Sequence, residues 1–460
     1  MLRCLQARLL EDLPAETVIT VGFSGGRDSV VLLDALSRLL PNDGSRLKAL
    51  HVHHGLSKYA DEWADFCTQF AAERGVHCAI HHASIKSDGA GLEAAARLAR
   101  FSAFAEAGAS VVALAHHLDD QAETVLLRLF RGSGVHGLAA MPRLRQQANQ
   151  QILWRPFLDQ ARAELENYAA RHALQWVEDD SNAYQYFTRN YLRHTVLPEL
   201  ASRFPAVKLI LGRTAQLADE ASVLLDERAE EDLAACQSAQ DSSALGLVQL
   251  QQLAPARLRN LLRYWLKLQG WPAPEMHTLL EWQKQLECAD AGSMAVLSYS
   301  AGECRLWQGN AYCVSRTQNL LKPVELTELP SLQNSSLAFG DGVINCCDKM
   351  SITGGEHDVN SYILRLDKAA VENAFQQDNT LRFASRSGGE KLQLAANRPN
   401  RPLKKHLQDS GFPPWVKASF PLMFIGETLV GCFGIGVKFD WLPKPNSDCF
   451  IFVWYPRIPK

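Results

Sequence analysis

The stretch VITVGFSGGRDSVVLLDALSRLL (residues 18–40) decides the first part of the fold. Residues 18–23 are apolar and β-branched, which is typical of a buried strand in a parallel sheet. A glycine turn follows, and the leucine-rich residues 30–40 predict a helix that ends before Pro41. Together these features predict a phosphate site, because the first N–H groups and the dipole of a helix favour an anion.

The turn itself reads Ser-Gly-Gly-Arg-Asp-Ser (residues 24–29) and lacks the lysine of a Walker loop. It resembles instead the loop of the ATP pyrophosphatases, which cleave ATP between the α- and β-phosphates. Asp28 would repel a phosphate, so its presence predicts that it holds Mg²⁺ or orients the loop. The alternative is an ordinary glycine-rich turn between a strand and a helix.

Two further predicted strands also end in polar side chains. Residues 47–53 predict a strand that ends at His53, and residues 110–115 predict one that runs directly into HHLDDQAET (residues 116–124) and a helix. Ligands of open α/β sheets lie beyond the carboxyl ends of the strands. Asp120 and Glu123 are three residues apart, so both can lie on one helix face. A hydrolytic site with two metal ions, or a capping cluster without chemistry, are the alternatives here.

Basic residues follow this region. Arg189 and Arg193 are four residues apart on a predicted helix, which suits contacts with phosphate or carboxylate groups. Residues 131–138 form a basic glycine loop that begins at Arg131, for which a helix C-cap followed by a turn is the alternative.

The order of strands and helices predicts three domains. Residues 1–205 predict an α/β domain with a doubly wound, mostly parallel sheet. Residues 206–320 predict a mainly helical domain with a β hairpin, and residues 335–460 predict a small α+β domain after a polar linker.

Residues 381–405 hold seven basic residues and one acid, whereas the whole chain carries a net charge of only −3. RNA binding would therefore depend on this local patch, unless the patch is a solvated loop.

The cysteines and the hydropathy pattern indicate the compartment. The eleven cysteines are scattered and form no CxxC pair, as expected of reduced thiols in the cytoplasm. No apolar run reaches about 18 residues, and the N-terminus lacks a signal peptide, so we expect a cytoplasmic protein without a membrane span.

Taken in order, these motifs resemble the tRNA(Ile)-lysidine synthase family, a branch of the ATP pyrophosphatases. The resemblance is carried by residues 24–29, 51–56, 91–97, 115–124, 131–138, 155–156, 180–193 and 386–415. It implies a bacterial ligase for the isoleucine tRNA with a CAU anticodon. ATP would adenylate the C2 carbonyl oxygen of the wobble cytidine and release pyrophosphate, and free L-lysine would then displace AMP to give lysidine. The codon and amino-acid identity of the tRNA would change from Met to Ile.

The resemblance also implies roles for individual residues. ATP would be bound by Ser24, Gly25, Gly26, Arg27, Asp28, Ser29 and His53, and Mg²⁺ by Asp28 and Asp119. Lysine would be bound by Asp120 and Glu123, and the catalytic residues would be Asp28, Asp120, Arg189 and Arg193. The tRNA would be bound by Arg131, Arg386, Arg398, Arg401, Lys404 and Lys405. The sequence does not fix the oligomeric state, and a homodimer stays one option.

Two other functions compete with this interpretation. A tRNA sulfur transferase shares the scaffold, but most such enzymes use a cysteine pair, and the first 200 residues contain only Cys4, Cys67 and Cys78. A non-catalytic tRNA-binding protein with a decayed ATP site is the other, and the intact Asp28, Asp119 and Asp120 argue against it.

Overall fold

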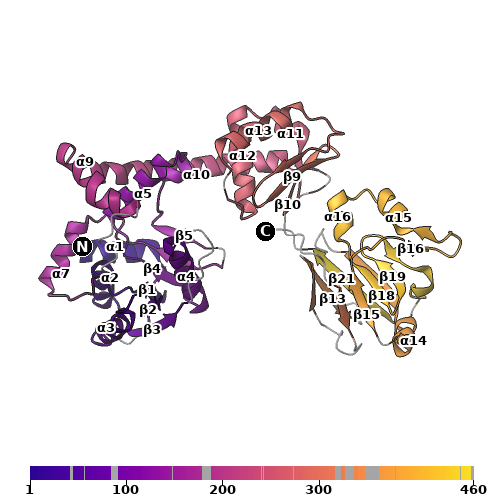
Figure 1. The fold of residues 1–460 in the computed structure, drawn as a ribbon, viewed down its shortest axis with the longest axis horizontal. Helices are drawn as coiled ribbons and strands as arrows, with labels where there is room; N and C mark the ends of the chain where they lie inside the picture. The colour runs from indigo at the N-terminus through magenta and orange to yellow at the C-terminus, as the bar shows by residue number, and fades with distance from the viewer. Residues whose placement is uncertain are drawn as a thin grey trace. The chain divides into compact units, whose positions relative to one another are not determined.

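The structure is a computed structural model of the 460-residue chain. It describes residues 1–41, 45–55, 57–83, 92–147, 149–178, 188–239, 241, 243–272, 274–315, 323–326, 336–340, 342–347, 362–378, 380–445 and 447–456. Of the motifs quoted above, Leu56, Gly91 and residues 180–187 lie outside the described residues. The chain divides into two compact units, residues 1–225 and 226–460 (Figure 1).

The first unit is built on a six-stranded sheet with the order β3-β2-β1-β4-β6-β5. The strands are β1 (Ile19–Gly22), β2 (Leu47–His53), β3 (His77–His82), β4 (Val111–Ala113), β5 (Leu144–Gln146) and β6 (Ile152–Trp154). All neighbouring pairs are parallel except β5 with β6. The predicted doubly wound, mostly parallel sheet is therefore confirmed. Its strand order reverses between β1 and β4, which is where such sheets bind ligands.

Helices surround this sheet (Figure 1), and α2, α3, α4, α5 and α7 each follow a strand along the chain. They are α1 (Leu2–Asp12), α2 (Arg27–Ser37), α3 (Ala60–Ala72), α4 (Leu92–Glu106), α5 (Leu118–Phe130), α6 (Val135–Leu138), α7 (Arg162–Arg171), α8 (Thr188–Tyr191) and α9 (Leu197–Arg203), with a π-helical turn at Leu192–Val196. Helix α2 begins three residues earlier than expected, because Gly26 is extended and serves as its N-cap. Asp28 consequently lies in the first turn of α2.

A buried carboxylate fastens α2 to its neighbours. Asp34 is 2% exposed and accepts hydrogen bonds from Arg38 Nε (2.8 Å), Arg74 Nε (2.9 Å) and Tyr168 Oη (2.8 Å). Burial alone would raise the pKa of Asp34, but these hydrogen bonds hold it below its ordinary value. The network joins α2 to the end of α3 and to α7, so it fixes the helix that carries the glycine loop.

Helix α10 (Val207–Cys236) is 30 residues long, and its first turns pack against α5. Gly212 faces Leu118 so closely that a Cβ there would lie 2.5 Å from Leu118 Cδ1. A glycine at this position therefore lets α10 approach the beginning of α5, and this approach brings Lys208 to Asp119.

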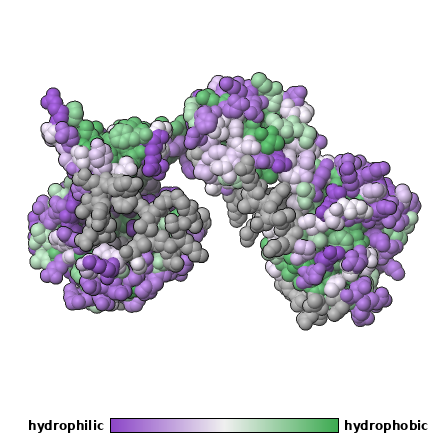
Figure 2. Space-filling model, viewed as in Figure 1, coloured by the Kyte–Doolittle hydropathy of each residue, from purple (hydrophilic) through white to green (hydrophobic). Residues whose placement is uncertain are grey.

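The opposite side of α10 is apolar and exposed. Ile210, Leu217 and Leu224 recur every seven residues and are 53%, 59% and 66% exposed. Figure 2 shows apolar residues gathered over the α5 and α10 part of the first unit. A surface of this kind is typical of contacts between proteins, and the homodimer stays a prediction.

The second unit contains two separate cores. The first combines α11 (Leu247–Gln252), α12 (Pro255–Leu268) and α13 (Met276–Cys288) with a four-stranded sheet in the order β7-β10-β9-β8, formed by β7 (Leu245–Gly246), β8 (Val296–Ser298), β9 (Gly302–Trp307) and β10 (Asn310–Ser315). The expected helices and hairpin are therefore present, and the meander of β8, β9 and β10 is antiparallel.

The second core belongs to the C-terminal region and lies between two antiparallel sheets. One has the order β11-β15-β18-β19-β20 and the other β12-β13-β21-β14. Their strands are β11 (Val324–Leu326), β12 (Ser336–Phe339), β13 (Gly342–Cys347), β14 (Tyr362–Asp367), β15 (Leu381–Ala384), β18 (Leu422–Ile425), β19 (Thr428–Cys432), β20 (Gly436–Val437) and β21 (Cys449–Pro456). Helices α14 (Lys368–Asp378), α15 (Leu403–Asp409) and α16 (Pro414–Ser419) and a short ribbon of β16 (Lys391–Leu392) with β17 (Arg401–Pro402) complete the small α+β fold that the sequence predicts.

Candidate active site

The glycine loop between β1 and α2 has the backbone of an anion site. Gly25 has φ +80°, and a Cβ there would lie 2.9 Å from Val177 Cγ2 and 3.0 Å from Cys67 Sγ. Glycine is therefore required for both conformation and space. The hydroxyl oxygens of Ser24 and Ser29 are 3.1 Å apart, and Ser29 Oγ donates to Gly26 O at 2.8 Å. Two hydroxyl groups thus flank the N-terminus of α2, where a phosphate would be favoured.

Asp28 is held between Arg27 and a histidine of α5's N-terminus. Its Oδ1 accepts from Arg27 Nε at 3.2 Å, and its Oδ2 lies 3.5 Å from His117 Nε2. Burial alone would raise the pKa of Asp28, but His117 and Arg27 hold it below its ordinary value. Conversely, burial would lower the pKa of His117, but Asp28 and Asp120 hold it above its ordinary value.

His117 is a residue that the sequence interpretation missed. It is the N-cap of α5: its Nδ1 accepts from the Asp120 amide at 3.4 Å, and its own amide donates to Asp120 Oδ2 at 3.1 Å. This reciprocal capping box leaves Nε2 facing Asp28. His117 therefore connects the glycine loop to α5. The sequence held one signal for this role. His117 directly precedes a predicted helix and Asp120 follows three residues later, which is the spacing of a capping box.

Behind His117, two carboxylates of α5 meet two arginines. Arg189 donates to Glu123 Oε2 at 2.7 Å and to Asp120 Oδ1 at 3.1 Å. Arg193 donates to Glu123 Oε1 at 2.6 Å and to Asp120 Oδ1 at 3.0 Å. Glu123 is fully buried, whereas the side chains of both arginines are about a quarter exposed. We call these four residues the carboxylate–arginine cluster, whose formal charges cancel.

Asp119 points away from this cluster. It contacts Lys208, and its Oδ2 accepts from the Arg162 amide at 3.2 Å. Both of its oxygens are thus engaged outside the glycine loop. Among the described residues, no group of three or more His, Cys, Asp or Glu side chains is arranged to hold a metal ion.

A Mg²⁺ ion that accompanies ATP needs fewer protein ligands than such a group would provide. Magnesium sites commonly use one or two carboxylates together with substrate phosphates and water. Asp28 fits this description, because its carboxylate lies in the phosphate loop and is 34% exposed. Asp119 fits less well because both its oxygens have partners, so its metal role stays a prediction.

The remaining expected residues have other partners or are exposed. His53 ends β2 and is 3.0 Å from Asp61. Arg131 is the exposed C-cap of α5. In the C-terminal region, Arg386 lies 3.8 Å from Glu390, and Arg401 donates to Asp409 at 2.7 Å. Arg398, Lys404 and Lys405 are exposed nearby, so the basic patch exists as a surface, and its ligand stays a prediction.

The fold and the loop define the class of protein first. Residues 3–200 match the PP-loop domain family, so the chain carries an ATP-using PP-loop domain. Residues 245–312 match the TilS substrate binding domain and residues 381–454 the TilS substrate C-terminal domain.

Relatives of full length identify the family. The chain is 37% identical over 452 residues to the tRNA(Ile)-lysidine synthase of Chromobacterium violaceum, covering 95% of each chain. It is 35% identical to that of Nitrosomonas europaea (95% of this chain and 92% of the relative) and 34% identical to that of Shigella flexneri (96% of each). The protein belongs to the tRNA(Ile)-lysidine synthase family and is an enzyme of that type. None of the described helices could span a membrane.

Proposed function

We propose that this protein joins free L-lysine to C2 of the wobble cytidine of tRNA(Ile) with a CAU anticodon, using ATP and releasing AMP and pyrophosphate. One observation carries the proposal. The phosphate loop is connected, through Asp28 and His117, to a cluster of carboxylates and arginines. An ATP site and a site for charged reactants are thus parts of one constellation.

In the first step, the C2 carbonyl oxygen of the cytidine attacks the α-phosphorus of ATP and pyrophosphate leaves. An anticodon base is already single-stranded, so it can enter a pocket at modest cost. The carbonyl oxygen is a weak nucleophile, and positioning and charge neutralisation must supply most of the catalysis. The Gly25–Gly26 turn and the hydroxyls of Ser24 and Ser29 would hold the phosphates. A Mg²⁺ ion on Asp28 would neutralise phosphate charge, and His117 keeps that carboxylate oriented.

In the second step, the ε-amine of lysine attacks C2 and AMP leaves. Free lysine is a cation near neutral pH, with an ordinary side-chain pKa of about 10.4. It needs a carboxylate to bind it and then a group that takes its proton. Asp120 and Glu123 are the residues we assign to these tasks.

The carboxylate–arginine cluster can accept these reactants without a change in net charge. Asp120 and Glu123 are already paired with Arg189 and Arg193. An arriving ammonium would replace a guanidinium at a carboxylate, and the released guanidinium would face the adenylate or an anticodon phosphate. This exchange gives Arg189 and Arg193 the catalytic role proposed for them.

The rest of the RNA would be bound elsewhere. We assign Arg131 and the basic residues between 386 and 405 to tRNA phosphates, which suit Arg and Lys and carry little sequence information. Since ATP, lysine and tRNA are cytoplasmic, we place the enzyme in the bacterial cytoplasm.

Incubation of the protein with ATP, radiolabelled lysine and a tRNA(Ile) transcript tests the proposal. We expect lysine to be retained on the RNA, with stoichiometric AMP and pyrophosphate. A transcript with uridine at the wobble position is the matched control and should stay unlabelled. Absence of label on the cytidine transcript, or incorporation of sulfur in a parallel reaction that contains sulfide in place of lysine, would contradict the proposed function.

A further inference from the structure

An exposed aromatic ring stands at the end of helix α5. Phe130 is the last residue of the helix, and its side chain is 68% exposed, more than any other Phe, Tyr or Trp side chain in the part of the chain that the structure describes. Leu129 beside it is 51% exposed. Single exposed apolar residues are common on protein surfaces, so the surroundings of this ring decide whether it has a ligand.

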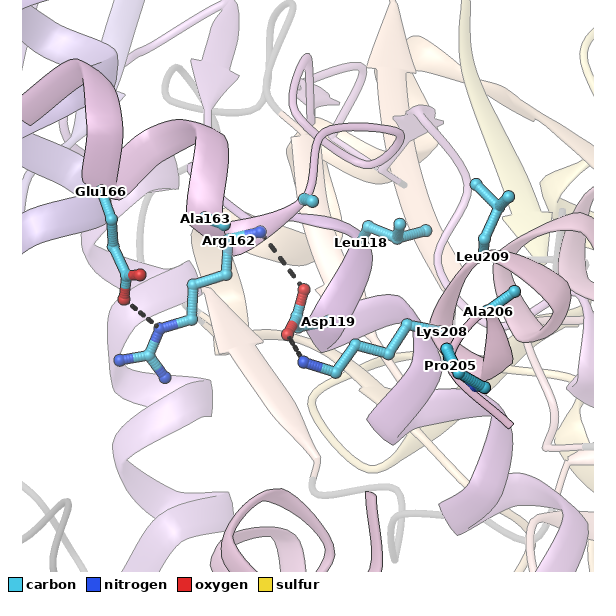
Figure 3. A pocket seen from close by; sticks show the side chains of 10 residues that line it. Leu118, Asp119, Arg162, Ala163, Glu166, Pro205, Ala206, Lys208 and Leu209 are labelled. Atoms are coloured by element: carbon cyan, nitrogen blue, oxygen red, sulfur yellow. Dashed lines mark hydrogen bonds and ion pairs between the residues drawn. The ribbon is translucent and has the colours of Figure 1, made fainter. Parts of the chain in front are cut away.

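The ring is held in a fixed place because α5 is anchored at both ends. In the first turn, Asp119 contacts Lys208 at the wall of a pocket between α5, α7 and α10 (Figure 3). Directly after the last turn, Gly132 has φ +68°, and its amide donates to Leu129 O at 3.0 Å. A glycine in this left-handed conformation ends a helix sharply, so Phe130 is presented from a rigid element.

Phe130 lies on the same face of α5 as the carboxylate–arginine cluster. Glu123 and Phe130 are seven residues apart, which brings two side chains to within about 20° of each other around a helix. Their separation along the axis is about 10 Å, at about 1.5 Å per residue. Arg193 of the π-helical turn covers Glu123, whereas Phe130 lies two turns further on and is exposed. A ligand at the cluster can therefore extend along this face to the ring.

The chain around the ring is basic. Residues 124–158 contain five arginines and no Asp or Glu, and three of these arginines are exposed: Arg128, Arg131 and Arg145. The dipole of α5 favours a cation at its C-terminus, but it gives no reason for the absence of every acid over this whole segment. An exposed aromatic ring among arginines is the combination that binds unpaired nucleotides.

We propose that Phe130 stacks on an unpaired base of the anticodon, the second or the third, and that Arg128 binds a phosphate beside it. This inference rests on the proposed function and extends it from the reacting cytidine to the neighbouring bases. A second copy of this chain is the other partner that an apolar surface could bind. In a two-fold dimer, however, the patch would face itself, and its arginines would repel one another.

The distance between the cluster and the ring fits an anticodon. Stacked bases are about 3.4 Å apart along one strand, so about 10 Å corresponds to at most about three nucleotides, and to fewer when the strand is stretched. If the wobble cytidine reacts at the cluster, the next two bases are the ones that can reach Phe130. Both are unpaired in the anticodon loop, so their faces are available for stacking.

Anticodon stem-loops that lack one base test this assignment with the full-length protein. On the intact stem-loop, Phe130→Ala should raise the Kd about 5- to 150-fold, as expected for one lost base stack. Phe130→Tyr should bind like the wild type, because its ring also stacks. When the second or the third anticodon nucleotide is made abasic, one of these two RNAs should cost the wild type a similar factor. On that RNA, Phe130→Ala should cost nothing further.

Two other variants complete the test. Leu129→Ala removes the exposed apolar neighbour, which points about 100° away around the helix, and it is the matched control that should keep the wild-type Kd. Arg128→Met should reduce the slope of log Kd against log salt concentration by about 1, equally on intact and abasic RNA. An unchanged slope would remove Arg128 from the proposal.

The contact between Phe130 and a base would be overturned if Phe130→Ala weakened binding by the same factor on the intact and on both abasic RNAs. It would also be overturned if Phe130→Ala changed the sedimentation coefficient of the free protein and left RNA binding intact, since the ring would then contact a second copy. Binding is measured without ATP and lysine. Failure of the wild-type protein to transfer lysine would therefore refute the proposed function separately.

Discussion

Replacing Glu123 by Gln tests the carboxylate–arginine cluster most directly. The wild-type side chain is fully buried and accepts three hydrogen bonds, of 2.6, 2.7 and 3.1 Å, from Arg193 and Arg189. Glutamine keeps the shape but removes the charge and turns an NH₂ group toward the two guanidiniums. We expect two separate consequences, one for folding and one for the chemical steps.

The cost in folding follows from the burial of the pair. Removing one partner of a buried ion pair costs about 3–5 kcal/mol, and the partial exposure of both arginines lowers this to roughly 2–3 kcal/mol. For a unit of this size, 1 kcal/mol corresponds to about 2–4 °C in Tm, so Tm should fall by roughly 4–12 °C. Differential scanning calorimetry measures this shift.

The effect on chemistry is the informative part. If Glu123 binds the lysine ammonium, Glu123→Gln should raise the KM for lysine about 10- to 100-fold, while tRNA-dependent release of pyrophosphate persists without lysine transfer. The assay measures pyrophosphate and lysine transfer in parallel, below the lowered Tm. Asp34→Asn is the matched control, because Asp34 is also buried in the first unit and also paired with two arginines. It should destabilise the protein and leave the KM for lysine unchanged. Equal loss of pyrophosphate release and lysine transfer in Glu123→Gln would refute the assignment and indicate a role in the ATP step.

Three further predictions follow from other parts of the chain. Asp28→Ala should abolish ATP-dependent modification and leave the Kd for tRNA nearly unchanged, because this carboxylate lies in the phosphate loop; undiminished turnover would exclude its proposed role. Asp34 should also stabilise the protein above about pH 4, where its carboxyl is ionised in the unfolded chain, and this stabilisation should disappear as the pH falls through its lower folded pKa. The Tm of Asp34→Asn should accordingly depend less on pH between about pH 5 and 2, and parallel curves for the two proteins would contradict this. Deletion of residues from Asn334 onward should weaken binding of full-length tRNA and flatten its salt dependence, with little change on an isolated anticodon stem-loop; equal salt slopes would show that the basic patch is only a solvated surface.

Local patterns were sufficient to predict the framework of the site. The apolar strand, the glycine turn and the following helix each depend on residues close in sequence, so β1, the loop and α2 could be predicted from residues 18–40. The rule that ligands collect at the carboxyl ends of parallel strands then placed the residues after β4 beside the loop. Asp28, Asp120 and Glu123 were singled out in this way, and the structure brings them to one end of the sheet through His117.

The choice of partners could not be predicted, because it depends on segments far apart in the chain. Asp119 and Asp120 look equivalent in sequence, yet one faces Lys208, 89 residues away, and the other faces the arginines. The directions are set by the helix, whose consecutive side chains diverge, and by the packing of α10 on α5 at Gly212. The sequence by itself determined the ATP loop, the sheet and the carboxylates available for chemistry. Only the tertiary structure decided which carboxylate meets which cation, because that pairing depends on how α7, α8 with its π-helical turn, and α10 pack against α5.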